Sequence, residues 1–232
     1  MFYLYFCGMA DISCDLNSCF LCKHCIPEWK EVIAIKKKTL VLKKGTLIFK
    51  EGSPVEGIFF LTDGAVKVHK QWGEQRELIV RFAKAGDVLG HRGLGGHHLY
   101  PISATCLEES KACYIPNDLL EATLQTNPAF TYRLMQLYAG ELQKAEKRMH
   151  DLALMEVKGR IALGLIEIAN LFGTDNEGTI NISLNRQDIA SYAGTTYETV
   201  FKFFTDLVAQ HIITTTGKRI KINDLPALQN FI

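Results

Sequence analysis

The 232-residue chain lacks several features that would assign it to a specialised class of protein. It has no apolar run of about 18 residues, the minimum for a membrane-spanning helix, and no low-complexity tract. The opening Met1–Cys7 is apolar but short, without the basic flank or cleavage site of a signal peptide. Met9 begins a more polar segment, so we expect Met1–Gly8 to be an extension from a misassigned start. These absences predict a cytoplasmic protein with no membrane partner.

Catalytic motifs and a strong charge imbalance are also missing. The sequence contains no G-x-S-x-G, no P-loop and no H-E-x-x-H, and its histidines have no companion nucleophile motif. We therefore predict that the protein is not an enzyme. Its net charge is only +1 at pH 7, so the chain as a whole lacks the basic excess of a protein that binds nucleic acid through bulk charge.

Near the C-terminus, Asn185–Ile213 has the pattern of two short helices joined by Gly194. Asn185 is suited to cap the first helix, and Gly194 can adopt the left-handed conformation that ends it. A helix-turn-helix has this pattern and presents its second helix to the major groove of DNA. The apolar residues of the second helix that recur at helical spacing and are expected to face inward are Val200, Phe204, Leu207 and Val208.

The start of this second helix leaves two alternatives open. If Thr195 is the N-cap, Glu198 completes a T-x-x-E capping box and its role is structural. If Thr196 is the N-cap, Glu198 is free to accept a hydrogen bond from the amino group of a cytosine. The sequence favours neither.

A β-hairpin is predicted next, over Thr214–Asn223, with its turn at Thr216-Gly217. From Glu156 to the end the chain has seven Lys or Arg and eight Asp or Glu, so the number of charges does not indicate DNA binding. The positions of the basic residues do indicate DNA binding, because three of them lie together in the hairpin. The basic residues of the hairpin, which we expect to contact phosphates, are Lys218, Arg219 and Lys221.

The segments LNRQDIASYAGTTYETVFKFF and TTTGKRIKI resemble the winged helix-turn-helix of the cyclic-AMP receptor protein / fumarate–nitrate reduction regulator (CRP/FNR) family of bacterial transcription factors. The resemblance extends over roughly Lys37–Ile222. It implies a dimeric, sequence-specific DNA-binding transcriptional regulator that acts on a near-palindromic site and contacts RNA polymerase. The residues that it assigns to DNA contact are Thr196, Tyr197, Glu198, Thr199, Phe201 and Lys202.

Three of these positions depart from the family pattern. The family usually has arginine at the positions of both Tyr197 and Lys202, or at the latter alone, and a small residue at the position of Phe201. Phe201 could contact a thymine methyl group, so we expect a target sequence different from the family's best-known one.

Seven cysteines without an export signal indicate thiols or metal ligands rather than disulfides. Four of them form a C-x4-C-x2-C-x2-C run whose short spacers suit zinc or an iron–sulfur cluster, with free thiols as the alternative. These four are Cys14, Cys19, Cys22 and Cys25. In the family, oxygen-sensing members bind a [4Fe–4S] cluster through three N-terminal cysteines and a fourth in the sensor domain, where Cys113 lies here. The N-terminal spacing differs from that branch, and a buried core thiol is the alternative for Cys113.

Between these ends, short alternating strands punctuated by glycine predict an antiparallel barrel or jelly-roll, with a hairpin turn at Asp63-Gly64. The segment KKGTLIFKEGSPVEGIFFLTDGAVKV resembles the family's cyclic-nucleotide-binding β-roll. Members that bind cyclic AMP use G-E-L-[GS] and a later Arg-Ser, whereas Gly90–Gly93 reads GHRG and Tyr100–Ser103 reads YPIS. We therefore do not expect cyclic AMP to bind. The remaining candidates for an effector pocket are His91, Arg92 and Ser103.

Three histidines of one glycine-rich segment, His91, His97 and His98, could also be metal or haem ligands, and a solvated surface loop is the alternative that we prefer. A short helix over Asn117–Asn127 and a long one from Pro128 to about Met155 are predicted next, followed by a helix over Val157–Phe172. The long helix carries an a/d seam that, as in the family, implies a homodimer. The seam residues are Met135, Tyr138, Leu142, Ala145, Met149 and Leu152.

The expected fold class is therefore α+β, in four parts. They are a cysteine-rich segment (residues 1–30), a β-roll sensor domain (31–127), a dimerisation helix (128–155) and a winged helix-turn-helix (156–232). Two alternatives to an oxygen- or redox-sensing regulator stay open: a cyclic-nucleotide-responsive regulator, and a regulator with a purely structural zinc at the N-terminal cysteines.

Overall fold

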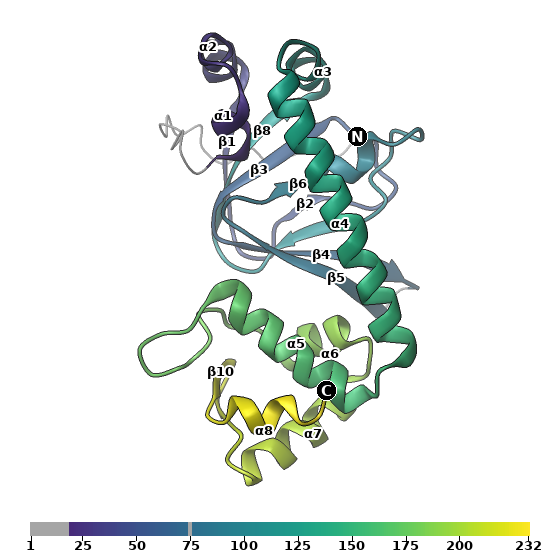
Figure 1. The fold of residues 1–232 in the computed structure, drawn as a ribbon, viewed down its shortest axis with the longest axis vertical. Coiled ribbons are helices and arrows are strands. Elements are labelled where there is room, and N and C mark those ends of the chain that lie inside the picture. Colours follow the sequence, from purple (N-terminus) through teal and green to yellow (C-terminus); the bar gives the residue numbers. More distant parts are fainter. Residues whose placement is uncertain (1–18, 74–75) are drawn as a thin grey trace. The chain divides into compact units, whose positions relative to one another are not determined.

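The computed structural model describes residues 19–73 and 76–232 (Figure 1). The predicted start at Met9 and the predicted metal ligand Cys14 lie outside these residues. The chain divides into two compact units, the first formed by residues up to Gln71 and by Arg81–Glu141, and the second by Trp72–Val80 and Leu142–Ile232. No helix of the described residues combines the length and the apolar character needed to cross a bilayer. The fold is α+β, as predicted.

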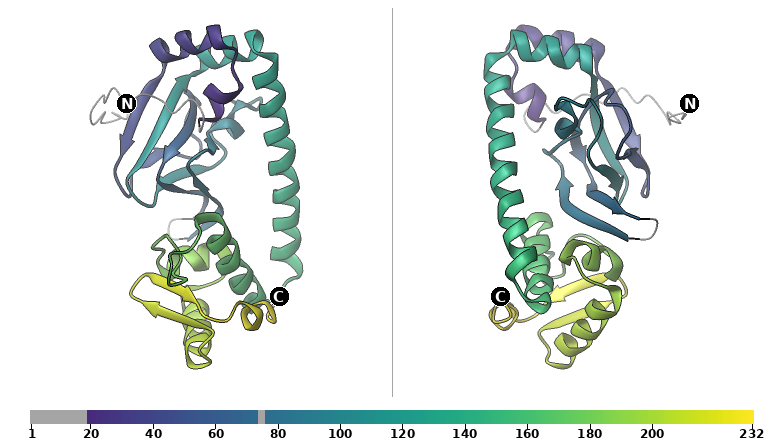
Figure 2. Two further views of the ribbon diagram at one scale, coloured as in Figure 1. Left: turned by 60° about the vertical axis from the view of Figure 1, so that its left-hand side comes forward. Right: turned by 90° about the vertical axis from the view of Figure 1, so that its right-hand side faces the viewer.

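Two four-stranded sheets form the β-roll of the first unit (Figure 2). One sheet has the strand order β1-β8-β3-β6 and the other the order β2-β7-β4-β5. Phe49 and Phe59, one from each sheet, stack with ring centroids 5.8 Å apart, so the two sheets pack face to face. The strands are β1 (Lys38–Leu42), β2 (Leu47–Phe49), β3 (Gly57–Asp63), β4 (Ala65–Trp72), β5 (Arg76–Lys84), β6 (Val88–Leu89), β7 (Ser103–Cys106) and β8 (Ser110–Pro116).

The predicted hairpin at Asp63-Gly64 is wrong, although the chain does turn there. Strands β3 and β4 on either side of Gly64 belong to different sheets, so the turn is a corner between layers. Gly64 has φ +85°, and a Cβ atom built on it would lie 2.5 Å from the carbonyl oxygen of Glu109. Only glycine fits, because both the backbone conformation and this close approach exclude a side chain.

The segment before the β-roll is helical, which the sequence reading missed. Helices α1 (Phe20–His24) and α2 (Pro27–Lys36) replace both the expected metal-binding loop and the first part of the expected strand region from residue 31. Pro27 begins α2 at its first position, where a missing N–H costs nothing. Trp29 of α2 donates from its indole Nε1 to Thr123 Oγ1 at 2.9 Å, which ties these helices to the rest of the first unit.

Two further helices follow the roll, α3 (Asn117–Thr126) and the 27-residue α4 (Pro128–Leu154), close to the predicted bounds. Every seventh residue of the predicted seam on α4 is exposed: Met135 at 58%, Leu142 at 61% and Met149 at 62%. The alternating seam residues, Tyr138, Ala145 and Leu152, are half-buried, and two of them contact their own chain. Tyr138 donates to the carbonyl oxygen of His91, and Leu152 lies against Gly194.

The second unit contains the expected helix-turn-helix. Its elements are α5 (Val157–Phe172), α6 (Arg186–Ala193), α7 (Tyr197–Ala209), β9 (Ile213–Thr216), β10 (Arg219–Ile222) and α8 (Leu225–Gln229). Strands β9 and β10 pair antiparallel with Thr216 opposite Arg219, so the turn lies at Gly217-Lys218, one residue later than predicted. Gly217 has φ +62° and supplies the left-handed conformation that such a turn requires.

Candidate nucleic-acid interface and effector pocket

Helix α6 is held at both ends by local contacts. Asn185 Oδ1 accepts a hydrogen bond from the Asp188 backbone N–H at 2.7 Å, and Asp188 Oδ2 accepts one from the Asn185 N–H at 3.4 Å. This reciprocal capping box satisfies two N–H groups that the helix leaves without partners. Gly194, with φ 62° and ψ 46°, ends the helix in the left-handed conformation. The predicted roles of Asn185 and Gly194 are therefore confirmed.

The start of helix α7 decides between the two capping alternatives. Thr196 is the N-cap, and its Oγ1 accepts from the Thr199 N–H at 3.3 Å, so the box predicted from Thr195 and Glu198 does not form. Glu198 is fully exposed in the first turn. Hydrogen bonds from its own backbone N–H and from the Thr196 hydroxyl lower the pKa of Glu198, so its carboxylate is ionised and can only accept hydrogen bonds.

One face of α7 is buried and apolar. Three of the four predicted inward residues are buried, namely Val200, Phe204 and Leu207, but Val208 is 39% exposed and its prediction was wrong. Phe203, which the sequence reading left out, takes its place at 2% exposure. At 100° per residue Phe203 and Val208 lie at opposite edges of the apolar stripe, so helical spacing alone does not decide which of them is buried.

The opposite face of α7 carries an aromatic pair. Tyr197 is 42% and Phe201 49% exposed, and their rings stack with centroids 6.3 Å apart. The guanidinium of Arg186, at the start of α6, lies 5.6 Å from the ring centroids of both Phe201 and Phe204. Cation–π contacts of this kind orient an exposed ring. The other candidate contacts on this helix are exposed at Glu198 and Lys202 and half-buried at Thr199.

The basic residues in the hairpin of β9 and β10 differ in exposure and in ion pairing. Lys218 lies exposed in the turn, and no ion pair involves it within the described part of the chain. Arg219 Nη2 is 3.0 Å from Asp175 Oδ2, which compensates part of its charge. Lys221 is half-buried. Lys218 is thus the basic residue of the hairpin best placed to meet a phosphate.

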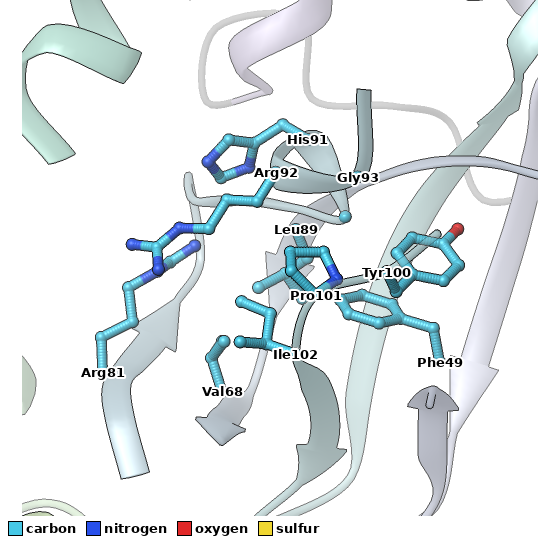
Figure 3. A pocket seen from close by; sticks show the side chains of 11 residues that line it. Phe49, Val68, Arg81, Leu89, His91, Arg92, Gly93, Tyr100, Pro101 and Ile102 are labelled. Carbon is cyan, nitrogen blue, oxygen red and sulfur yellow. The ribbon is translucent and has the colours of Figure 1, made fainter. Parts of the chain in front are cut away.

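In the β-roll, a pocket lies between β5, the segment Gly90–Gly93 and the strand region before β7. Figure 3 shows Arg81, His91 and Arg92 gathered on one side of it and aromatic and aliphatic side chains on the other. The pocket has room for about one water molecule. The apolar and neutral lining consists of Phe49, Val68, Leu89, Gly90, Gly93, Tyr100, Pro101 and Ile102.

Glu141, from helix α4, binds the charged side of this pocket. Its Oε2 is 3.0 Å from His91 Nε2 and 2.8 Å from Arg92 Nη2, and its Oε1 is 3.2 Å from Arg81 Nε. Burial by itself would raise the pKa of Glu141. The hydrogen bond from His91 and the charges of Arg81, His91 and Arg92 outweigh burial and lower it to about 2.

The other predicted effector residues lie elsewhere. Ser103 is buried, but its Oγ accepts from the Glu51 backbone N–H at 2.9 Å and it is not among the residues that line the pocket. His97 and His98 are exposed, in contrast to His91, which is 1% exposed. The three predicted histidines therefore do not form one site. Arg81 and Glu141, which complete the charged cluster, carried no motif that the sequence reading could use.

Two family models match the chain, and together they span most of it. The cyclic nucleotide-binding domain matches residues 39–127, and the Crp-like helix-turn-helix domain matches residues 159–231. The chain belongs to the CRP/FNR family.

Relatives in this family are transcription regulators. The chain is 27% identical to the CRP-like cAMP-activated global transcriptional regulator of Mycobacterium tuberculosis, over 74% of this chain and 77% of that protein. It is 28% identical to the anaerobic regulatory protein of Bacillus subtilis, over 68% of each chain. Among solved structures, FixK2 from Bradyrhizobium japonicum superimposes with a TM-score of 0.75 at 26% identity, covering 84% of this chain and 96% of that one.

Among the described residues, the cysteines predicted to bind a cluster lie together, but they are not arranged around a metal ion. Four cysteines share one buried apolar core with Leu21, Ile33 and Phe60, and they are Cys19, Cys22, Cys25 and Cys113. Burial and the nearby Cys19 raise the pKa of Cys25 to about 12. Yet among residues 19–73 and 76–232 no group of three or more His, Cys, Asp or Glu side chains is arranged to hold a metal ion. Cys106 is buried in the other sheet, apart from this core.

Proposed function

We propose that this CRP/FNR-family member is a dimeric, sequence-specific DNA-binding transcriptional regulator. The observation that carries the proposal is the two-sided character of α7. It buries Val200, Phe203 and Leu207 and leaves four side chains exposed on the other face, Tyr197, Glu198, Phe201 and Lys202. A helix anchored on one face and polar or aromatic at the N-terminal end of the other can enter a major groove. Lys218 would contact the adjacent backbone and fix the register.

The exposed stripe on α4 supports a dimer. Met135, Leu142 and Met149 recur every seven residues, and large apolar side chains at this spacing suit a two-stranded coiled coil. A two-fold axis along this helix sets two copies of α7 about one helical turn of DNA apart, so the target is near-palindromic. As a bacterial regulator of this type, the protein would act in the cytoplasm and contact RNA polymerase. We propose 1–30, 31–127, 128–155 and 156–232 as its functional parts.

Selection of bound sequences from a random duplex library tests this proposal directly. We expect enrichment of one near-palindromic sequence, with half-sites about 10 base pairs apart centre to centre. Sedimentation of the Leu142→Glu variant should show a monomer. Gln143→Glu introduces the same side chain at the next position, where an exposed polar residue stands already, and this variant should remain dimeric. Enrichment of no sequence by the wild-type protein would contradict the proposal.

For the signal, we propose that the N-terminal cysteines hold a redox-responsive [4Fe–4S] cluster. Two observations support it: soft thiol ligands are gathered in one buried apolar core, and Cys14 supplies a fourth N-terminal thiol in sequence. The described thiols alone are not arranged for a metal ion, and Cys14 lies outside the described residues. A bound cluster would carry the redox chemistry, and the surrounding apolar residues would limit its access to water.

Absorption spectra and metal analysis of anaerobically purified protein separate the alternatives. Iron–sulfur absorbance that is lost in air and in the Cys22→Ser variant, but kept in Cys106→Ser, supports the cluster. One zinc per chain without such absorbance supports a structural metal instead. Cyclic AMP is not proposed as the effector, because Gly90–Gly93 lacks the ribose-binding glutamate and the pocket holds only about one water.

A further inference from the structure

The exposed face of α7 places a carboxylate and an aromatic ring side by side. Glu198 and Phe201 are three residues apart, so on an α-helix they lie about 60° apart around the axis and about 4.5 Å apart along it. Both side chains are exposed, and Phe201 keeps 49% of its surface accessible. The two groups can therefore contact one ligand at the same time.

The ring of Phe201 is held in one orientation by its neighbours. Tyr197, one turn earlier, stacks on it with 22° between the ring planes. The guanidinium of Arg186 lies 5.6 Å from the centroid of the same ring. Because these contacts order the ring in advance, less side-chain entropy is lost when it packs against a small apolar group.

The carboxylate of Glu198 has acceptor capacity left over. Its own backbone N–H and the Thr196 hydroxyl donate to it, and the charge of Lys202 lies one turn further on; together they lower the pKa of Glu198. An ionised carboxylate has about four acceptor sites, so these two hydrogen bonds leave room for a donor from outside the protein. Another acceptor placed against it would be repelled.

The major-groove edges of the bases decide which ligand suits this pair of groups. Cytosine presents an amino donor at N4 and no methyl group, and thymine presents a methyl group at C5 beside the O4 acceptor. Adenine offers an amino donor but no methyl group. A 5-methylcytosine combines the amino donor of cytosine with the methyl group of thymine on adjacent ring atoms. It is therefore the base that satisfies both the carboxylate and the ring.

We propose that Glu198 and Phe201 form a site for 5-methylcytosine in duplex DNA, so that the protein distinguishes methylated from unmethylated copies of its target. The N4 amino group donates to the carboxylate of Glu198, and the C5 methyl group packs against the ring of Phe201. This inference rests on the proposed function, which requires α7 to enter the major groove. It deepens that function by naming the base that α7 prefers.

Fluorescence anisotropy tests this site on a sequence selected from the random duplex library. At each cytosine position in turn, on either strand, the duplex carries cytosine, 5-methylcytosine or thymine opposite its normal partner. For the wild-type protein, methylation of the recognised cytosine should strengthen binding about fourfold per half-site, the value of one buried methyl group. Thymine at that position should bind about tenfold more weakly than 5-methylcytosine, since its O4 faces the carboxylate.

Substitutions separate the two halves of the site. Phe201→Ala should bind the cytosine and 5-methylcytosine duplexes alike, because the contact with the methyl group is gone. Glu198→Ala should keep the preference for a methyl group but bind 5-methylcytosine and thymine alike. Lys218→Ala is the matched control, because a phosphate contact should weaken binding to all three duplexes and leave their ratios unchanged.

Equal affinity of the wild-type protein for cytosine and 5-methylcytosine at every position would overturn the proposal. A methyl preference that persists in Phe201→Ala would also overturn it, as would tighter binding of thymine than of 5-methylcytosine. Each of these results leaves the proposed function intact, because the selected sequence is still bound. Enrichment of no sequence by the wild-type protein would overturn both.

Discussion

The helix-turn-helix and the β-roll pocket differ in the sequence separation of the residues whose contacts form them. In the helix-turn-helix, Asn185 binds Asp188 and Thr196 binds Thr199, three residues away in each case. In the pocket, Glu141 binds His91 and Arg92, which are 50 and 49 residues away. Local contacts follow from short motifs, whereas the pocket exists only once the roll and α4 have packed. The first region is therefore readable from sequence, whereas in the second the sequence pointed only to His91 and Arg92 and not to their partners Arg81 and Glu141.

The largest expected effect tests whether the helix-turn-helix also depends on packing between elements and not only on local contacts. Phe203→Ala removes a large side chain that is 2% exposed, and we expect the free energy of unfolding of the second unit to fall by about 3–5 kcal/mol. Val208→Ala, at an apolar position that is 39% exposed, should cost less than about 1 kcal/mol. Urea denaturation of both variants, followed by far-ultraviolet circular dichroism, measures the difference. Equal losses would show that α7 is not anchored as described.

In the pocket, replacing Glu141 should lower the free energy of unfolding by an amount that depends on pH. The pKa of Glu141 is about 2 in the folded protein against an ordinary 4.5, so its ionised form stabilises the fold by up to about 3 kcal/mol. Because the folded pKa is the lower one, this contribution is complete above pH 4.5 and is lost as the pH falls towards 2. We expect wild-type protein to be more stable than Glu141→Gln at pH 7. The difference in free energy of unfolding should shrink as the pH falls from 4.5 to about 2. A gap that is independent of pH would contradict the charge argument.

Substitutions in the DNA-binding surface should distinguish residues that recognise bases from residues that contact the phosphate backbone. Glu198→Ala should relax specificity at one base pair by about 1–3 kcal/mol, because Thr196 caps the helix and Glu198 is left to face the groove. Lys218→Ala should weaken binding to all sequences alike and reduce the salt slope by about one. Fluorescence anisotropy on a selected site and its single-base variants, at several salt concentrations, measures both. If both variants bind as wild type does, these assignments fail.

The smallest expected effect is on the cap of α6. Asn185→Ala removes the acceptor of the capping box and should destabilise the second unit by about 1 kcal/mol. Gln187→Ala, exposed in the same turn, should be neutral within about 0.5 kcal/mol. Thermal unfolding distinguishes the two, and a loss of several kcal/mol from Asn185→Ala would mean that this residue does more than cap a helix.

Prediction from sequence failed where two elements had to meet. Asp63-Gly64 has the composition of a hairpin turn, but the strands that it joins belong to different sheets and pair with different neighbours. Val208 satisfies the helical spacing as well as Phe203 does, yet the side chains packed against α7 bury only Phe203. The cysteine run predicted a metal-binding loop, whereas α1 and α2 form there because their apolar residues join the core with Phe60.

By itself, the sequence determined the α+β class, the order of the elements and the helix-turn-helix, since caps, turns and helical periodicity act over a few residues. Only the tertiary structure decided which residues share the pocket. His91 and Arg92 are neighbours in one segment, but neither Arg81 nor Glu141 shares a motif with them, and the fold alone brings these groups together. Glu141 is the buried counter-charge of the cluster, and without it the two guanidinium groups would keep only the partly exposed Asp87, which is costly in the interior.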